Sequence, residues 1–504
     1  MHTSANEFGV GAFRAFLPPE MIPPCNQPPS SARTRAPIGL CVADACLGCK
    51  RAGAAGAGSA LTTRAVTPSI ERVNSHRPHR AGVPDHEGAI AGAAYTRHRR
   101  IHRSRSHPRP RILQLLATGG NGGAQESYTG LLLRLDRSRY EVRALSLSAG
   151  SGVQRLRALG VAVDVLDETD DELAVRELAA WLRREEIDLV HAHMYRAEVL
   201  GTRAAVAAGT PVIMATVHSS RVRSPKDTAL LASLTPSIDR LIVPSGNIRH
   251  KVSSEGRAGA RFAVIPNGVD LSRFATPAPR CGLRDEFGIP HDAPLVGVVA
   301  RLEPEKGHRY LIEAMPAILA ASPDAWLTIV GEGSEADALK AQTAALGQGL
   351  GGRIVFTGRR EDVSAITADL TVAVLPSLRE AQGISILEAM ARRRPVVASA
   401  VGGIPEVITD SLDGLLVPPA DPGALARAIS SLLVDPSLRA EIGEAGYRTV
   451  AQRFSIDAQV KRIEAVYDEE LARAGVLARV RRPQPARASS GRPSERGALE
   501  VPPV

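Results

Sequence analysis

The chain has 504 residues, of which 44% are hydrophobic but only 3% aromatic. This length exceeds what one hydrophobic core usually serves, so we expect two domains with aliphatic cores. No stretch approaches the ~18 consecutive apolar residues of a membrane span. The net charge of +9 belongs to the ends of the chain: residues 1–110 carry +9, residues 474–504 carry +4 and the remainder −4. The basic composition therefore does not indicate that a folded core binds nucleic acid.

The two ends are rich in Arg, Pro, Ala and Ser and show no sustained hydrophobic period. Such segments cannot bury enough apolar surface to offset their ordering entropy, so residues 1–110 and 474–504 are predicted to be disordered. Cysteines 41, 46 and 49 have a spacing like part of an iron–sulfur ligand set, but their surroundings are of low complexity, and we expect no metal site. Sparse cysteines favour a reducing, cytoplasmic location.

From Arg111 the sequence alternates between apolar strands and helical stretches, which predicts a parallel sheet covered on both faces. A Rossmann-like domain is therefore expected over residues 111–280, and residues 276–294, which contain Pro277, Pro279, Gly282 and Pro290, are predicted to be a linker. The predicted strands are 111–117, 140–147, 161–166, 187–191, 212–216, 240–243 and 262–265.

The second half repeats this plan, so a second Rossmann-like domain is expected over residues 281–454. One helix should begin at Asp421-Pro422, a cap followed by proline in the first turn. A last helix over residues 455–473 carries apolar residues at helical spacing. The predicted strands are 295–300, 326–330, 354–357, 371–375, 395–399 and 415–417. The predicted fold is α/β, with two doubly wound parallel-sheet domains facing across a cleft, because ligands bind at the carboxyl edges of such sheets.

The run from Glu380 to Glu388 carries the most specific chemical signal. It follows an apolar strand and leads through a glycine into a helix. Backbone amides at Gly383, Ile384 and Ser385, together with the helix dipole, would form an anion site at the carboxyl end of the strand. Carboxylates near that site can accept hydrogen bonds from hydroxyl groups, so the arrangement suits a nucleotide sugar.

This run resembles the E-x7-E signature of glycosyltransferase family 4, and further motifs follow in the order of that family between Arg111 and Leu471. These motifs are the glycine loop Gly122-Gly123-Ala-Gln125, the run Pro266-Asn-Gly-Val-Asp270, the run Arg301-Leu-Glu-Pro-Glu-Lys306-Gly307 and the turn Val330-Gly331-Glu-Gly333.

The resemblance implies the GT-B fold and a retaining glycosyltransferase that works by front-face substitution, without a metal or a cofactor. It implies that Glu380 contacts the donor sugar and that Glu388 binds the ribose. Arg301 and Lys306 would meet the negative charge that gathers on the departing diphosphate. The turn at Gly331 and Gly333 would also belong to the donor site, the strand end at Thr357 and Gly358 would lie near the nucleobase, and the last helix would return to the first domain.

The expected donor is a UDP- or GDP-sugar, and the expected acceptor is a sugar or a lipid-linked sugar. A bacterial cell-surface glycan, exopolysaccharide or glycolipid is the expected product. We expect a cytoplasmic enzyme with peripheral contact at the inner face of the membrane and no nucleic-acid partner. In the first domain, Gly122 and Gly123 would let backbone amides approach a phosphate or the acceptor.

Three histidines lie near predicted strand ends in the first domain. Because side chains alternate between the two faces of a strand, we expect His191 and His193 to point to opposite faces, which argues against a two-histidine metal site. One of them is expected to be structural. His218 follows the strand 212–216 at the carboxyl edge, and we expect it to act on the acceptor.

Two other functions compete with sugar transfer. The turn Gly331-Glu-Gly333 also fits an NAD-dependent oxidoreductase, but the acidic residue Glu361 follows the second strand only after two arginines, which disfavours that alternative. A nucleic-acid-binding protein acting through the basic ends is the other alternative. One departure from the family stands at Arg393, where a glycine is usual, and predicts a changed helix end or a cap outside the left-handed region.

Overall fold

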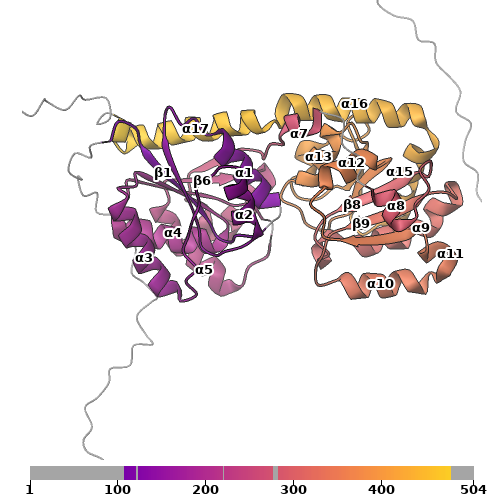
Figure 1. Cartoon of the computed structure of the whole chain (residues 1–504), viewed down its shortest axis with the longest axis horizontal. Helices are drawn as coiled ribbons and strands as arrows, with labels where there is room; N and C mark the ends of the chain where they lie inside the picture. Colours follow the sequence, from indigo (N-terminus) through magenta and orange to yellow (C-terminus); the bar gives the residue numbers. More distant parts are fainter. Residues whose placement is uncertain (1–106, 121–122, 220, 276–281, 478–504) are drawn as a thin grey trace, which may run out of the picture. The chain divides into compact units, whose positions relative to one another are not determined.

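The computed structural model describes residues 107–120, 123–219, 221–275 and 282–477 (Figure 1). The predictions of a disordered extension and tail fall almost wholly outside these ranges, as do the five cysteines. Within the described residues, no helix combines the length and the apolar composition that crossing a membrane would require.

The first half forms a seven-stranded parallel sheet in the order β3-β2-β1-β4-β5-β6-β7. This is the Rossmann strand order with one further strand at the edge. The predicted strands are confirmed, although the third is shorter than expected. The strands are β1 (Arg111–Leu116), β2 (Glu141–Ser146), β3 (Asp164–Val165), β4 (Leu189–His193), β5 (Val212–Thr216), β6 (Arg240–Val243) and β7 (Phe262–Val264).

Helices cover both faces of this sheet, and the alternation along β1 shows how. Leu113 and Leu115 pack among side chains of α3 and α4, whereas Ile112 packs against residues of α1 and α17 on the other face. The helices of this half are α1 (Gly123–Arg134), α2 (Ser151–Ala158), α3 (Asp171–Arg184), α4 (Tyr195–Ala208), α5 (Pro225–Leu234), α6 (Gly246–Val252) and α7 (Leu271–Ala275), with two short helical segments η1 (Thr235–Ser237) and η2 (Ser253–Arg257).

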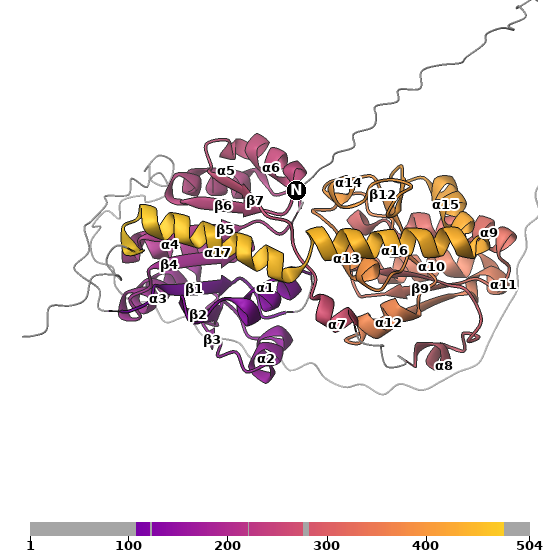
Figure 2. The same cartoon turned by 90° about the horizontal axis from the view of Figure 1, so that it is seen from above.

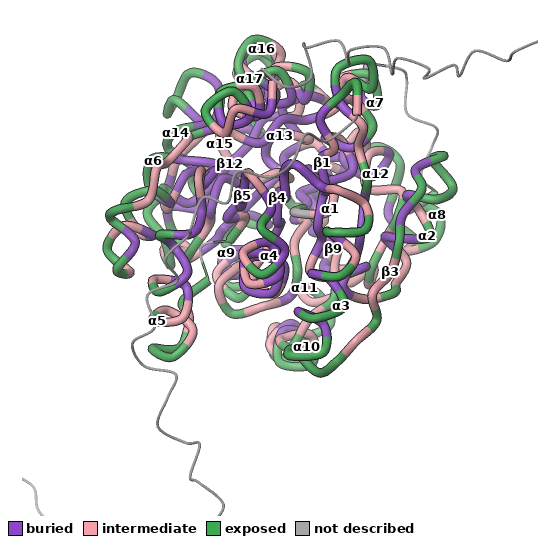
Figure 3. Tube along the Cα trace, turned by 90° about the vertical axis from the view of Figure 1, so that its left-hand side faces the viewer, coloured by how far each residue is buried: buried purple, intermediate pink, exposed green. Residues whose placement is uncertain are grey.

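The second half forms a six-stranded parallel sheet in the order β10-β9-β8-β11-β12-β13, again the Rossmann order. All six predicted strands are confirmed. They are β8 (Leu295–Val299), β9 (Trp326–Val330), β10 (Ile354–Gly358), β11 (Val372–Leu375), β12 (Val396–Ser399) and β13 (Leu415–Val417). In Figure 3 the strands β1, β4, β5 and β12 are drawn as buried, as are most of the other strand residues.

The helices around the second sheet are α8 (Leu283–Phe287), η3 (Pro304–Lys306), α9 (His308–Ala321), α10 (Ala336–Ala345), α11 (Gly347–Gly351), α12 (Val363–Asp369), α13 (Ile384–Ala391), α14 (Ile404–Val407), α15 (Pro422–Val434) and α16 (Pro436–Arg453). The predicted start of α15 is confirmed, because the carboxylate of Asp421 accepts a hydrogen bond from the amide of Ala424 at 2.8 Å. The carboxylate of Asp435 caps α16 in the same way.

The last helix, α17 (Ile456–Arg473), returns to the first half of the chain, as the family resemblance implied (Figure 2). Its apolar residues Ile456, Val460, Ile463, Tyr467 and Leu471 are all buried, and they pack with side chains of β1, β4, β5 and β6. The end of the chain therefore completes the apolar core on one face of the first sheet.

Two predictions about local structure were wrong. Residues 276–294 are more than a linker, because α8 lies within them and Leu283 and Ile289 are buried in the core of the second half. The end of α13 keeps a left-handed residue although glycine is missing: Arg393 has a φ of 55°. Its guanidinium lies over the ring of Tyr447 and donates a hydrogen bond to Glu444 of α16, contacts that stabilise this strained conformation.

The loop before α7 packs closely against the junction of α16 and α17. The amide of Val269 donates to the carbonyl of Phe454 at 2.8 Å, and the amide of Gly268 donates to the side chain of Gln459 at 2.8 Å. A Cβ atom on Gly268 would lie 2.4 Å from the carbonyl oxygen of Ser455, which is backbone and cannot rotate away.

We predict that Gly268→Ala lowers the stability of the protein by about 1–3 kcal/mol, the usual cost of overpacking. Thermal unfolding monitored by circular dichroism measures the change. Gly259→Ala is the matched control, because a Cβ atom there meets nothing within 4 Å. Equal melting temperatures for the two variants would show that the loop shifts to accommodate the Cβ atom with no loss of stability.

Candidate active site

A lysine and a glutamate meet at the carboxyl edge of the second sheet. Lys306 ends the turn η3 that follows β8, and Glu380 lies in the loop after β11. The ammonium of Lys306 forms an ion pair with the Glu380 carboxylate, and their side chains are only 16% and 12% exposed. The structure thus brings together two predicted site residues that are 74 residues apart in sequence.

Backbone contacts hold these two loops against each other. The carbonyl of Glu305 accepts a hydrogen bond from the amide of Leu378 at 2.8 Å. Gly307 has a φ of 68°, and a Cβ atom there would lie 2.1 Å from the carbonyl oxygen of Pro376. Glycine is therefore required after Lys306 both for the left-handed conformation and for this close approach.

The first turn of α13 lies directly beyond Glu380. Gly383 precedes it with a φ of 87° and offers no side-chain cap, so the amides of Ile384 and Ser385 begin the helix as predicted. A Cβ atom on Gly123, the first residue of α1, would lie 3.3 Å from Cδ1 of Ile384. The glycine loop of the first sheet and the start of α13 after Glu380 are thus neighbours; Gly122 lies outside the described residues.

Glu388 lies one turn further along α13. Burial and, to a smaller extent, the nearby carboxylate of Glu126 on α1 together raise its pKa to about 7, although Arg273 and Arg155 oppose the shift. These two arginines both bind Glu126. Glu388 therefore lies in a charged cluster formed by both halves of the chain, which its spacing from Glu380 did not reveal.

Arg301 follows β8, but its side chain is 61% exposed and its guanidinium lies 3.2 Å from the carboxylate of Glu305. It is close to Lys306 in the chain, yet among the described residues its guanidinium pairs with Glu303 and Glu305 and not with Glu380.

The glycine turn after β9 packs against the segment that contains Arg301. Gly331 has a φ of 146°, and a Cβ atom there would lie 2.0 Å from the carbonyl oxygen of Ala300. A Cβ atom on Gly333 would lie 2.3 Å from the carbonyl oxygen of Leu302. The amide of Gly331 donates to the carbonyl of Gly358 at 2.9 Å, which joins this turn to the strand end that also contains Thr357. The predicted donor-site glycines therefore share one edge of the sheet.

The prediction for His191 and His193 was wrong. Residues two apart on a strand share a face, and the two ring centroids are 4.1 Å apart. Nδ1 of His193 lies 3.1 Å from Nε2 of His218, so all three rings belong to one cluster. Burial lowers the pKa of His191 to about 3 and that of His218 to about 4, and it holds the pKa of His193 well below its usual range.

A group of buried amides lies beside the site, and none of its members is among the site residues predicted from the sequence. The side-chain carbonyl of Gln382 accepts hydrogen bonds from the backbone and side-chain nitrogens of Asn267, at 2.7 and 3.0 Å, and its amide nitrogen donates to the Asn267 carbonyl at 3.1 Å. Ser127 and Gln459 extend the group to α1 and α17. Asn267 and Gln382 both lie inside predicted motifs, but no pattern among neighbouring residues indicates that they contact each other.

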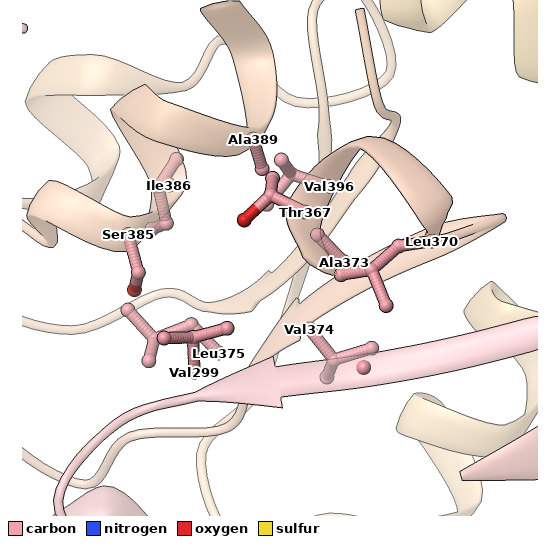
Figure 4. A pocket seen from close by; sticks show the side chains of 11 residues that line it. Val299, Thr367, Leu370, Ala373, Val374, Leu375, Ser385, Ile386, Ala389 and Val396 are labelled. Carbon is pink, nitrogen blue, oxygen red and sulfur yellow. The ribbon is translucent and has the colours of Figure 1, made fainter. Parts of the chain in front are cut away.

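A small apolar pocket lies beneath α13 (Figure 4). Its volume of about 10 Å³ holds at most one water molecule. Ser385 and Ile386 line it together with side chains of β8, β11, β12 and α12, so it is a packing gap in the second core and not a substrate site. Within the described residues, no group of three or more His, Cys, Asp or Glu side chains could hold a metal ion.

Two Rossmann-like parallel sheets in one chain form the GT-B fold. Family models agree: Glycosyltransferase Family 4 matches residues 121–273, and Glycosyl transferases group 1 matches residues 282–449. The chain belongs to the glycosyltransferase family that these two models describe.

Curated relatives support this assignment. The chain is 31% identical to a GDP-mannose-dependent monoacylated alpha-(1-6)-phosphatidylinositol monomannoside mannosyltransferase of Corynebacterium glutamicum, over 58% of this chain and 79% of the relative. It is 28% identical to a D-inositol 3-phosphate glycosyltransferase of Streptomyces avermitilis, over 75% of this chain and 91% of the relative. Among solved structures, Anabaena Alr3699/HepE in complex with UDP-glucose is 25% identical, with a TM-score of 0.63, over 71% of this chain and 99% of that chain.

Depressed histidine pKa values make stability depend on pH. The unfolded chain binds protons near pH 6.5, whereas the buried histidines stay neutral until about pH 4, so stability is lost as the pH falls through this range. His308 isolates the effect, because burial lowers its pKa to about 4 and its ring nitrogens have no hydrogen-bond partner among the described residues.

We predict that His308→Leu flattens the fall in unfolding free energy between pH 6.5 and 4.5 by up to ~1.4 kcal/mol per pH unit. Urea denaturation across this pH range measures the slope. His291→Gln is the control, because the side chain of His291 is 68% exposed. An unchanged slope in His308→Leu would mean that this ring is protonated in the folded protein.

Proposed function

We propose that the protein is a retaining glycosyltransferase that moves a sugar from a nucleotide-sugar donor to a hydroxyl acceptor. The ion pair of Lys306 with Glu380, next to the first turn of α13, is the observation that carries the proposal. A cation, a carboxylate and helix N-terminal amides at one place offer partners for a diphosphate and for the sugar attached to it.

The departing diphosphate gathers negative charge as the glycosidic bond breaks. Lys306 would stabilise that charge, together with the amides of Ile384 and Ser385. Arg301 would join them by exchanging its exposed contact with Glu305 for the diphosphate. The turn at Gly331 and Gly333 would border the donor, since its backbone packs against the segment that holds Arg301.

The two glutamates would act on different parts of the donor. Glu380 would contact the sugar and stabilise positive charge that develops at its anomeric carbon. Glu388 would accept hydrogen bonds from the ribose hydroxyls, and Thr357 and Gly358 would border the nucleobase. In front-face substitution the acceptor attacks from the side of the leaving phosphate, which takes up the acceptor proton. We expect neither a metal nor a cofactor in this step, so EDTA should leave the rate unchanged.

The relatives suggest the class of substrate. The Corynebacterium glutamicum relative is named for GDP-mannose and a phosphatidylinositol mannoside, and the Anabaena structure contains UDP-glucose. We therefore propose a UDP- or GDP-sugar as donor and a sugar or lipid-linked sugar as acceptor. A bacterial cell-surface glycan, exopolysaccharide or glycolipid would be the product, made in the cytoplasm or at the inner face of the membrane, without a nucleic-acid partner.

We predict that one class of sugar nucleotide raises the melting temperature of the full chain. A ligand at 100 times its Kd adds about 2.7 kcal/mol to the stability of the folded state. A thermal-shift panel of UDP-, GDP- and ADP-sugars identifies the base and the sugar, and NMR of the product shows whether the anomeric configuration is retained. A shift with NADH and none with any sugar nucleotide would instead support an oxidoreductase.

We predict that Glu380→Gln lowers kcat with little change in donor affinity, because the charge that Glu380 meets develops only in the transition state. Removal of one such stabilising group typically costs about 10²–10³ in kcat. Glu388→Gln should mainly raise the donor KM, because the ribose does not react. Steady-state kinetics of both variants separate the two roles.

The charge state of Glu388 sharpens this test. Its pKa of about 7 means that Glu388 becomes a carboxylate as the pH rises through 7. Only the carboxylate form accepts hydrogen bonds from both ribose hydroxyl groups. The donor KM of the wild type should therefore fall between pH 6 and 8, and Glu388→Gln should remove this dependence. Glu361→Gln is the control, since the Glu361 side chain is 86% exposed. Unchanged kinetics in both test variants would leave the two glutamates without a role in transfer.

A further inference from the structure

A continuous chain of hydrogen bonds crosses one face of the first sheet. It begins at His218, after β5, and passes through His193 on β4 to Gln114 on β1: Nδ1 of His193 is 3.1 Å from His218, and its Nε2 is 2.9 Å from Oε1 of Gln114. It continues to Tyr467 of α17, whose hydroxyl accepts from Nε2 of Gln114 at 2.8 Å. It ends at His191, whose Nδ1 lies 2.6 Å from that hydroxyl.

We propose that Gln114 and Tyr467 are positioning residues that hold His218 in a single tautomer, with its proton on Nε2 and its lone pair on Nδ1. The proposal rests on the proposed function and on the expectation from the sequence that His218 acts on the acceptor: the ring would accept a hydrogen bond from the acceptor hydroxyl and orient it, while the leaving phosphate takes up the proton. It adds a role for the returning helix α17, which would then serve the site as well as the packing of the sheet.

Burial fixes which atoms of this chain donate hydrogen bonds and which accept them. Gln114, His191 and Tyr467 are fully buried and His193 is 2% exposed, whereas His218 is partly exposed at the edge of the sheet. Buried polar groups almost always have hydrogen-bond partners, so each donor in the chain must face an acceptor. The side chain of Gln114 decides the direction, because its nitrogen can only donate and its oxygen can only accept.

The tautomers follow from this direction. Since Oε1 of Gln114 accepts, Nε2 of His193 carries the proton of that ring. Nδ1 of the neutral His193 ring therefore has a lone pair and accepts a hydrogen bond from the protonated Nε2 of His218. On the other side, Nε2 of Gln114 donates to the Tyr467 oxygen, so the Tyr467 proton points to Nδ1 of His191. Nε2 of His191 then donates to the hydroxyl of Thr216 at 2.6 Å.

The surroundings support a neutral chain. The edge of the Tyr128 ring contacts the His193 ring, and its hydroxyl donates to the backbone carbonyl of Gln114 at 3.1 Å. Burial raises the pKa of both Tyr128 and Tyr467 above the ordinary range. The lone pair on Nδ1 of His218 is therefore the one that a substrate hydroxyl could use, because Nε2 is occupied by His193.

The tautomers can be read directly by long-range ¹H–¹⁵N NMR of the full chain labelled with ¹⁵N-histidine. We expect His218 of the wild type to carry its proton on Nε2 alone. Tyr467→Phe keeps the ring but removes the acceptor for Gln114, so the amide can turn over and His218 should become a mixture of both tautomers. We expect kcat to fall roughly two- to tenfold with the donor KM unchanged, because only one tautomer can accept a hydrogen bond from the acceptor hydroxyl at Nδ1 and orient it for attack.

Tyr140→Phe is the matched control. The Tyr140 hydroxyl binds Asp468 of α17 at 2.7 Å, and its ring packs edge-on against Tyr467, but it takes no part in the chain of hydrogen bonds. This variant should loosen α17 without changing the tautomer of His218 or kcat. Equal effects of the two variants on kcat and on the tautomer would show that Tyr467 is only structural.

Gln114→Glu gives a second, sharper outcome should Tyr467→Phe unfold. A carboxylate accepts from both neighbours, so His218 should keep its tautomer, whereas the Tyr467 proton turns to Glu and Nδ1 of His191 becomes protonated. A proton on Nδ1 of His218 in the wild type would overturn the proposal. The spectra need no turnover, so absence of sugar transfer would refute the proposed function while the tautomer test still stands.

Discussion

The pairing of Asn267 with Gln382 is the contact on which the arrangement of the site depends. Three hydrogen bonds join these two buried side chains and the Asn267 backbone, and Gln459 of α17 and Ser127 of α1 bind the same group. A buried amide left without a partner costs about 1–3 kcal/mol, so these residues are held in one arrangement. Because Gln382 lies two residues after Glu380, the same contacts fix the loop that carries the candidate catalytic carboxylate.

The returning helix links this group to the histidine cluster. Gln459 and Tyr467 lie two turns apart on α17. Gln459 binds the loop that contains Asn267, and Tyr467 binds Gln114 of strand β1. A single amphipathic helix therefore supports both the loop that carries Glu380 and the edge where His218 lies. Its apolar residues supply the binding energy, whereas the buried polar groups of Gln459 and Tyr467 specify its position, since an unpaired amide or hydroxyl there would be costly.

Local sequence patterns were sufficient to place the strands, although not helix α8, because strand and helix periods and capping residues act over a few neighbours. The cap at Asp421 is an example. The same reasoning failed where a long-range contact overrode a local preference. Arg393 takes a left-handed conformation that favours glycine because Tyr447 and Glu444 of α16 hold its side chain. The error over His191 and His193 was different in kind, since the period of two in a strand already places them on one face.

The sequence alone determined the fold class, the order of the strands along the chain and the motifs that contain Glu380, Glu388 and Lys306, since these depend on residues near one another. Only the tertiary structure decided which of these groups meet. Lys306 pairs with Glu380, 74 residues away, and Gln114 binds Tyr467, 353 residues away. Contacts of this kind leave no local pattern, because a buried polar side chain is satisfied by whichever partner the packing of the sheets and of α17 brings within hydrogen-bond distance.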